Sequence, residues 1–190
     1  MHIQKIAKII SYLFVPPVLN FLIFINLSIY FESNSKMWFS IIISFLFGLI
    51  IPIITFIYFR KKGKIVDDDA TVKEERTVPY IYAILFTLSG VILSGVFNLN
   101  ESIIMLWMIY LICSILIINI NRFWKISAHT IGAGIPLGAS IFINNIYFFL
   151  AVIILVGWSR FYLKVHTIPQ IITGGIVGFL FSYLLLNFCL

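Results

Sequence analysis

The stretch MWFSIIISFLFGLIIPIITFIYF, residues 37–59, decides the class of fold. It contains no charged side chain, and about 20 consecutive apolar residues are enough for an α-helix to cross the hydrocarbon core of a bilayer. The chain holds further apolar runs, at about residues 10–31, 80–97, 102–120, 130–143, 146–158 and 171–190. The pattern predicts an all-α fold, a polytopic membrane helical bundle with about six or seven transmembrane helices.

The composition of the whole chain agrees with a membrane protein. Of its 190 residues, 62% are hydrophobic and 11% are charged, and the mean hydropathy is +1.10. Soluble domains carry about 25% charged residues and about 45–50% apolar ones. The composition therefore excludes a soluble globular domain, a disordered chain and a collagen-like fibre. The two cysteines, Cys113 and Cys189, lie inside apolar runs and indicate neither a disulfide framework nor a metal knuckle.

The hydrophilic stretches divide the chain into three parts. Residues 1–59 hold two predicted N-terminal transmembrane helices, and Pro16-Pro17 is expected to break or kink the first of them. Residues 60–79 form a basic loop that carries the first of three polar motifs. Residues 80–190 form the predicted transmembrane catalytic core.

Two apolar runs of that core, 130–143 and 146–158, are short and are divided by Asn144-Asn145. This spacing, with polar residues at the far ends of both runs, predicts a helical hairpin and a site that is sunk below the membrane surface and shielded by neighbouring helices. Two small-x-x-x-small pairs predict close helix packing. They are Gly134 with Gly138 and Gly174 with Gly178.

The charges predict how the chain is oriented. There are 13 Lys+Arg residues against 7 Asp+Glu, and seven spans would place 12 of the 13 on one side, with Lys36 alone on the other. The positive-inside rule makes that side cytoplasmic. In so apolar a chain, positive charge indicates the lipid bilayer and its phosphates as partners, and no nucleic acid. We expect an integral, multi-pass protein of a bacterial inner membrane.

Three polar segments are predicted to meet at the basic face. They are KEERTVPY (73–80), KISAH (125–129) and SRFYLKVHTIPQ (159–170). Arginine forks and lysine ammonium groups bind phosphate oxygens, and the start of the helix after residue 129 adds free N–H groups. Of two histidines, one can attack phosphorus and the other can protonate the leaving alkoxide. The residues therefore predict a phosphate site whose histidine roles remain interchangeable.

The last two segments resemble motifs of the type 2 phosphatidic acid phosphatase superfamily, which also contains vanadium haloperoxidases and bacterial acid phosphatases. The resemblance covers roughly residues 73–178. Ser159, Arg160 and His166 stand at the spacing of the third family motif. The second motif is usually Pro-Ser-Gly-His, and residues 126–129 read Ile-Ser-Ala-His.

Two positions depart from the family pattern. The first motif is usually Lys-x6-Arg-Pro; here Pro79 follows Arg76 two residues late, and the lysine position is Asp69. Lys73 and Lys125 are the candidates for the missing lysine. The family also places an Asp four residues after the nucleophilic histidine, where this chain has Gln170. A glutamine carbonyl can still orient the imidazole, without supplying the charge that stabilises an imidazolium.

The resemblance implies a metal-independent phosphatase without a cofactor. In it His166 attacks the phosphorus, His129 protonates the leaving group, and Arg76, Arg160 and Ser127 hold the phosphoryl oxygens. The substrate would be a phosphate monoester or diphosphate on a membrane lipid. The expected classes are phosphatidate, phosphatidylglycerol phosphate, a prenyl diphosphate and a lipid A phosphate. Many membrane members of the family act on the outer leaflet, but the charge rule places the active site of this chain on the cytoplasmic side.

Three other hypotheses fit parts of the sequence. His129 and His166 could be the axial ligands of a haem. Asp67–Asp69 could bind Mg²⁺ and a diphosphate in a prenyltransferase, although the chain has no second carboxylate cluster and the triplet is also typical of a solvated loop. Gln170 and the imperfect first motif are compatible with a catalytically inactive member of the family.

Overall fold

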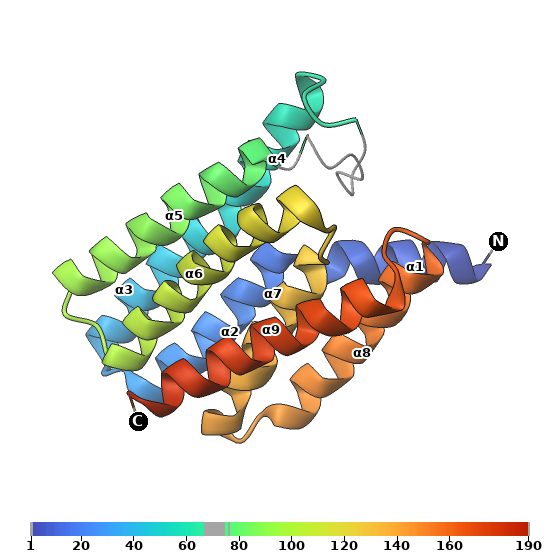
Figure 1. Cartoon of the computed structure of the whole chain (residues 1–190). Helices are drawn as coiled ribbons and strands as arrows, with labels where there is room; N and C mark the ends of the chain where they lie inside the picture. The colour runs from blue at the N-terminus through green and yellow to red at the C-terminus, as the bar shows by residue number, and fades with distance from the viewer. Residues whose placement is uncertain (1, 67–74, 76, 190) are drawn as a thin grey trace.

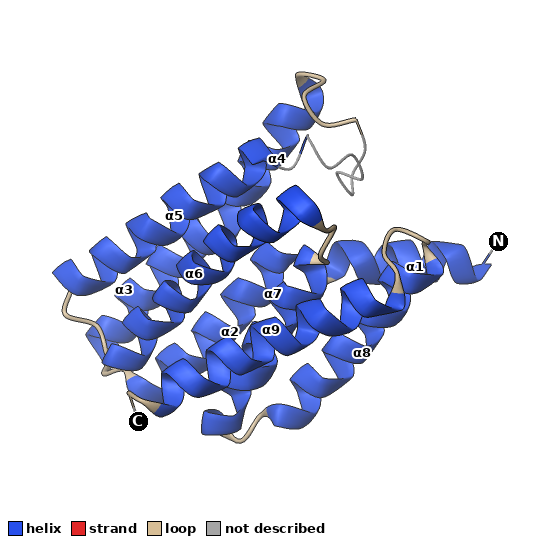
Figure 2. Ribbon diagram, viewed as in Figure 1, coloured by secondary structure: helices blue, strands red, loops and turns tan. Residues whose placement is uncertain are grey.

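The computed structural model describes residues 2–66, 75 and 77–189, and every long element in these ranges is a helix (Figure 2). The all-α prediction is therefore confirmed for the described residues. In chain order the elements are α1 (His2–Leu13), α2 (Pro16–Phe31), α3 (Asn34–Ile43), the π-helix η1 (Ser44–Ile50), α4 (Ile51–Lys61), α5 (Thr77–Val96), α6 (Glu101–Phe123), α7 (Ala128–Ser140), the 3₁₀-helix η3 (Ile141–Ile143), α8 (Ile146–Tyr162) and α9 (Ile168–Asn187).

Several helices are long and apolar enough to cross a membrane, as expected of a multi-pass protein. Within the described residues four stretches qualify: Asn34–Lys61, Thr77–Val96, Glu101–Phe123 and Ile168–Asn187. The bent pair α1–α2 makes a fifth if it counts as one span. The predicted six or seven spans are not confirmed, because Ala128–Ile143 and Ile146–Tyr162 are both shorter than an unaided crossing requires.

The predicted break in the first apolar run is present. α1 ends at Leu13, and α2 begins at Pro16 with its axis turned by 52°. Val15 is extended, with φ −63° and ψ 150°, which is the conformation that a following proline imposes. Because Pro16 and Pro17 have no N–H, the hydrogen-bond ladder of α1 cannot continue through them.

The helices from α2 onward run up and down, so that their junctions gather at two ends (Figure 1). We call one end the basic end: it holds α1, the C-terminal end of α4, the N-terminal end of α5, and the α6–α7 and α8–α9 junctions. The opposite end holds the α2–α3, α5–α6 and α7–α8 junctions and the C-terminal end of α9. Among the lysines and arginines that the structure describes, Lys36 alone lies at the opposite end.

Helix α7 lies at the centre of the bundle and is buried at every position from Thr130 to Ser140. Its neighbours are α2, α8 and α9. A Cβ on Gly134 would lie 2.4 Å from the Gly175 carbonyl oxygen, and a Cβ on Gly178 would lie 2.4 Å from that of Ile131. The close approach predicted from the small-residue pairs is thus confirmed, and it brings the N-termini of α7 and α9 together.

The predicted hairpin turn is also present. Asn144, in the left-handed region at φ 53°, separates η3 from α8. α7 is enclosed by its neighbours. α8 buries Phe149, Val152 and Val156 on one face and exposes Tyr147 and Ile154 elsewhere. Of the two helices of the hairpin, α7 therefore lies inside the bundle and α8 lies at its edge.

Candidate functional site

The turn between α8 and α9 presents the most specific of the predicted motifs. Lys164 adopts φ 57°, and its N–H donates to the Phe161 carbonyl at 2.9 Å, which ends α8. Three residues later Thr167 caps α9, and Pro169 stands in the first turn, where no intrahelical donor is needed. His166 lies between these two signals and is buried, with 6% of its surface exposed.

Gln170 holds His166 in one tautomer. The Gln170 Oε1 atom accepts the backbone N–H of Thr167 at 3.1 Å, as the return bond of the capping box. Because the N–H of Thr167 needs an acceptor, the amide atom at this position is the oxygen of Gln170 and not its nitrogen. The same oxygen lies 3.2 Å from Nδ1 of His166. Because a carbonyl oxygen only accepts, Nδ1 carries a proton in this contact.

Ser127 brings the second motif beside the third. It is fully buried and caps α7, its Oγ accepting the N–H of Thr130 at 3.4 Å. Its own N–H donates to the Gln170 carbonyl oxygen, also at 3.4 Å. His129 follows in the first turn of α7 and is half-buried. The two helix N-termini with their motif residues therefore meet around Gln170, as the glycine contacts between α7 and α9 require.

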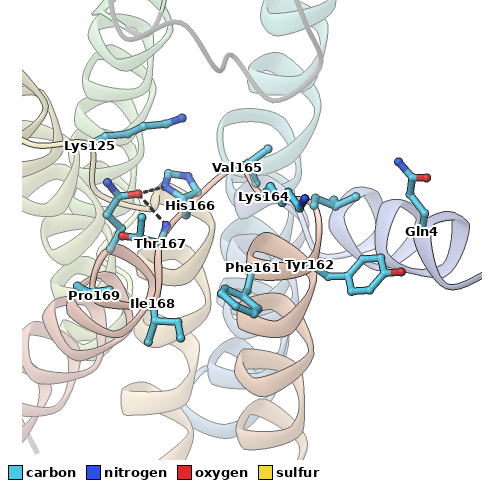
Figure 3. A pocket seen from close by; sticks show the side chains of 12 residues that line it. Gln4, Lys125, Phe161, Tyr162, Lys164, Val165, His166, Thr167, Ile168 and Pro169 are labelled. Carbon is cyan, nitrogen blue, oxygen red and sulfur yellow. Dashed lines mark hydrogen bonds between the residues drawn. The ribbon is translucent and has the colours of Figure 1, made fainter.

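A hollow of about 1160 Å³ opens at this end of the bundle (Figure 3). Of the predicted site residues, Lys125, His166 and Gln170 line it. Figure 3 shows Lys125 and Lys164 on either side of His166 in this view. Gln4 of α1 contributes to the far wall. The hollow thus combines an imidazole of defined tautomer with two ammonium groups.

Arg160 is not among the residues that line the hollow. It is buried, with 1% of its surface exposed, and its Nη1 donates to Oγ of Ser11 at 2.6 Å. The hydroxyl of Ser159 donates to the carbonyl oxygen of Ala7 at 2.8 Å. The sequence motif predicted a phosphate contact for Arg160 and did not indicate its partner Ser11 on α1. The sequence does show an alternation of isoleucines with lysines over residues 2–13, ahead of the apolar run at 10–31, and this pattern distinguishes the segment from the apolar run that follows.

Two predicted residues, Lys73 and Arg76, lie outside the described residues, as does Asp67–Asp69. The first motif is therefore known only from the sequence. The structure places the other six predicted site residues at the basic end, on α7, α8 and α9 and the segments that precede α7 and α9. They are Lys125, Ser127, His129, Arg160, His166 and Gln170.

The chemistry of the site has to be judged from these residues themselves. No protein-family model, no curated protein and no solved structure matches the chain. In the part of the chain that the structure describes, no three His, Cys, Asp or Glu side chains gather where they could hold a metal ion. An imidazole, lysine ammonium groups and a helix N-terminus are groups that can attack and bind a phosphoryl group.

Proposed function

We propose that the protein is a membrane lipid phosphatase that hydrolyses a phosphate monoester or diphosphate through a phosphohistidine on His166. The hydrogen bond from His166 Nδ1 to Gln170 Oε1 carries this proposal. It supports a nucleophilic role because, in an imidazole with its proton on Nδ1, Nε2 is the nitrogen that can attack phosphorus. The resemblance of residues 159–170 to the third family motif points to the same histidine.

The reaction proceeds in two steps. Nε2 of His166 forms a bond to phosphorus while the bond to the lipid oxygen breaks, and His129 gives its proton to that oxygen. Water then attacks the phosphohistidine, the P–N bond breaks, and His129 takes the proton of the water. Lys125 and the N–H groups at the start of α7 bind the phosphoryl oxygens, with Ser127 at the cap. Arg160, Arg76 and Lys73 are assigned from the motif pattern alone.

The proposed topology has seven crossings, from α2, Asn34–Lys61, α5, α6, α7 with η3, α8 and α9. Two observations support it: the described basic residues gather at one end, and successive helices alternate in direction (Figure 1). Short central helices can cross within a bundle, since neighbouring helices shield their ends. The positive-inside rule then places the basic end and the reaction on the cytoplasmic side of a bacterial inner membrane.

The decisive experiment measures phosphate release by the purified protein in EDTA, with phosphatidate and a prenyl diphosphate as substrates. We expect turnover by the wild type and by His2→Ala, a control that removes the exposed third histidine. His166→Ala should lose about 10³-fold or more of the rate while keeping the melting temperature. Radiolabelled substrate should leave an acid-labile phosphate on the wild type and on His2→Ala, but not on His166→Ala.

The same measurements distinguish the other hypotheses. A Mg²⁺-dependent prenyltransferase would be silent in EDTA and active with Mg²⁺. A haem protein would show a Soret band that is lost in His129→Ala and His166→Ala. Equal phosphate release by the wild type and His166→Ala would overturn the phosphohistidine mechanism, and no release by any preparation would indicate an inactive family member.

A further inference from the structure

Helix α1 carries an apolar surface that the rest of the described bundle leaves exposed. At 3.6 residues per turn its five large aliphatic side chains fall within one arc of about 120°. Ile10 is partly buried, and the other four are exposed, with exposed fractions between 47% and 58%. These four residues are Ile3, Ile6, Ile9 and Leu13. Lys5 and Lys8 lie beyond the edge of this arc, among the other polar residues of the helix, and are exposed as well.

Besides the aliphatic arc and the lysines, α1 has a third stripe of side chains, which attaches this helix to the bundle. Ala7 and Ser11 are buried and accept hydrogen bonds from Ser159 and Arg160 of α8. These contacts leave both the aliphatic arc and the lysines facing away from α8. α1 is thus held along one stripe, while the described part of the chain leaves its two chemically opposed surfaces uncovered.

The aromatic residues of α8 mark the depth at which α1 lies. Trp158 and Tyr162 are exposed, and their rings stack with centroids 5.5 Å apart. They flank Ser159 and Arg160, the residues that bind α1. Tryptophan and tyrosine concentrate where a membrane meets water. Because α1 docks on the same turn of α8, it lies at the level of that aromatic belt.

The lysines argue against α1 as the outer half of a membrane-crossing helix. Lys5 and Lys8 would then enter the hydrocarbon, where an ammonium group is costly. The 52° bend at Pro16 instead carries α1 away from the axis of α2. Its charges also complement an anionic lipid surface, which attracts basic residues within a Debye length.

We propose that α1 is an interfacial helix, with its isoleucine arc in the boundary between headgroups and acyl chains of an anionic leaflet and with Lys5 and Lys8 among the phosphates. An amphipathic helix of this kind places its apolar face about 5–10 Å into that boundary. Gln4 of the same helix lines the hollow at the basic end, so the lipid surface adjoins the mouth of the site. The proposal does not depend on phosphatase activity.

The test uses an environment-sensitive fluorophore on single cysteines of the full-length chain, in a Cys113→Ala and Cys189→Ser background, reconstituted into nanodiscs. The matched positions are Ile6→Cys in the aliphatic arc and Lys8→Cys among the polar residues, both exposed, so neither label has to displace core side chains. Lys64→Cys, at the exposed end of the α4 segment, serves as the reference for water. Nitroxide lipids with the spin label near the headgroup or near the chain end report depth, and iodide reports contact with water.

At position 6 we expect the emission to shift to the blue, with the strongest quenching from the shallow nitroxide. At position 8 we expect stronger quenching by iodide. Replacing phosphatidylglycerol by phosphatidylcholine in the nanodiscs should reduce the shallow quenching at position 6. Iodide quenching at position 6 equal to that at position 64 would overturn the proposal, because α1 would then lie in water. Strongest quenching of both positions by the deep nitroxide would show a membrane-crossing α1, and quenching unaffected by lipid charge would remove the anionic surface from the proposal.

Discussion

The two ends of the bundle use their polar side chains in opposite ways. At the opposite end, Oε1 of Glu32 accepts the N–H of Asn100 at 2.5 Å, and Oδ1 of Asn100 accepts the N–H of Ser102 at 2.9 Å. Nζ of Lys36 donates to the carbonyl oxygen of Asn98. These bonds join the α2–α3 junction to the start of α6. The polar groups there serve the helix ends themselves.

At the basic end the polar groups surround a hollow instead. Lys125, Lys164 and His166 line about 1160 Å³ of open space. The helix N-termini of α7 and α9 are capped by Ser127 and Thr167, while Gln170 joins them. Where polar groups only stabilise a helix end, they hydrogen-bond to its N–H groups and enclose no open space. The basic end satisfies its caps and still leaves charged groups in reach of a ligand, which is the arrangement that binding requires.

The largest effect is expected from a change at Gln170, because this residue hydrogen-bonds both the N-cap residue of α9 and the imidazole of His166. Gln170→Leu removes the acceptor for His166 and for Thr167. Because His166 is then no longer held with its proton on Nδ1, we expect the rate to fall about 10²-fold. Gln170→Glu keeps an acceptor of the same length and adds a negative charge that stabilises the imidazolium. It should equal or exceed the wild-type rate on lipid phosphates.

Thermal melting in detergent separates chemistry from folding in this pair. Both variants should melt within a few degrees of the wild type, since a lost cap costs about 1 kcal/mol. A rate for Gln170→Leu equal to that of Gln170→Glu would show that the hydrogen bond to His166 has no part in catalysis.

A smaller effect is expected from Ser11, which ties α1 to Arg160. Ser11→Ala removes a hydrogen bond to a charged donor, which is worth about 1.5–3 kcal/mol. Arg160 then loses its fixed position, and we expect about a tenfold rise in KM and weaker inhibition by vanadate, with kcat less affected. Steady-state kinetics with phosphatidate measure both quantities.

Ser28→Ala is the matched control for this variant. Ser28 is also buried and bonds to Ser40 at 2.6 Å, but near the opposite end of the bundle. It should lower the melting temperature without changing KM or the vanadate sensitivity. Identical kinetics for the two serine variants would contradict a positioning role of Ser11 for Arg160.

At the opposite end, a change at Glu32 should lower the stability of the protein and leave its activity unchanged. Glu32→Ala leaves the N–H of Asn100 without its carboxylate acceptor, and we expect a loss of about 1 kcal/mol, or about 2–4 °C in melting temperature. The turnover number should stay at the wild-type value. Glu101→Gln, which removes an exposed charge from the first turn of α6, should change the melting temperature less. A fall in activity for Glu32→Ala that matches Ser11→Ala would show that the two ends are coupled.

The smallest expected effect is a difference in thiol reactivity between the two ends of the bundle. Cys189 follows α9 at the opposite end, and its burial, together with the negative charge of Glu101, raises the pKa of its thiol. Since the thiolate is the reactive form, a membrane-impermeant maleimide should label Cys189 slowly in intact cells at neutral pH and faster as the pH rises. Lys64→Cys in a Cys189→Ser background should resist labelling until the cells are permeabilised.

This pair of cysteines also decides the sidedness. Position 64 is preferable to its neighbour Gly63, whose φ of 70° disfavours any side chain. Rapid labelling of Lys64→Cys in intact cells, with protection of Cys189, would place the basic end outside the cytoplasm.

Some tertiary features could be predicted because they depend on residues close together in the sequence. The prolines at 16 and 17 remove donors from their own helix, so the break between α1 and α2 follows from local chemistry. Asn144 tolerates the left-handed conformation at the α7–α8 turn. His166 and Gln170 are four residues apart, and the resemblance to the third family motif implied that the amide orients the ring.

Other features could not be predicted because they depend on contacts between distant segments. Ser11 and Arg160 are separated by 149 residues, and no local pattern indicates that one binds the other. The predicted number of spans is not confirmed for a related reason. Hydropathy measures the apolar character of α7 but not its position, and only the packing shows that this short helix lies inside the bundle, where no lipid contact sets its length.

The sequence by itself determined the helical membrane class, the breaks between helices and the clustering of basic residues toward one end. These follow from hydropathy, proline chemistry and charge, which act over a few residues. The tertiary structure decided that Ser127 meets Gln170, that Arg160 is bound by α1, and that Lys125 and His166 share one hollow. Such contacts depend on how closely whole helices approach, and here glycines on α7 and α9 set that distance by admitting backbone where a Cβ would collide.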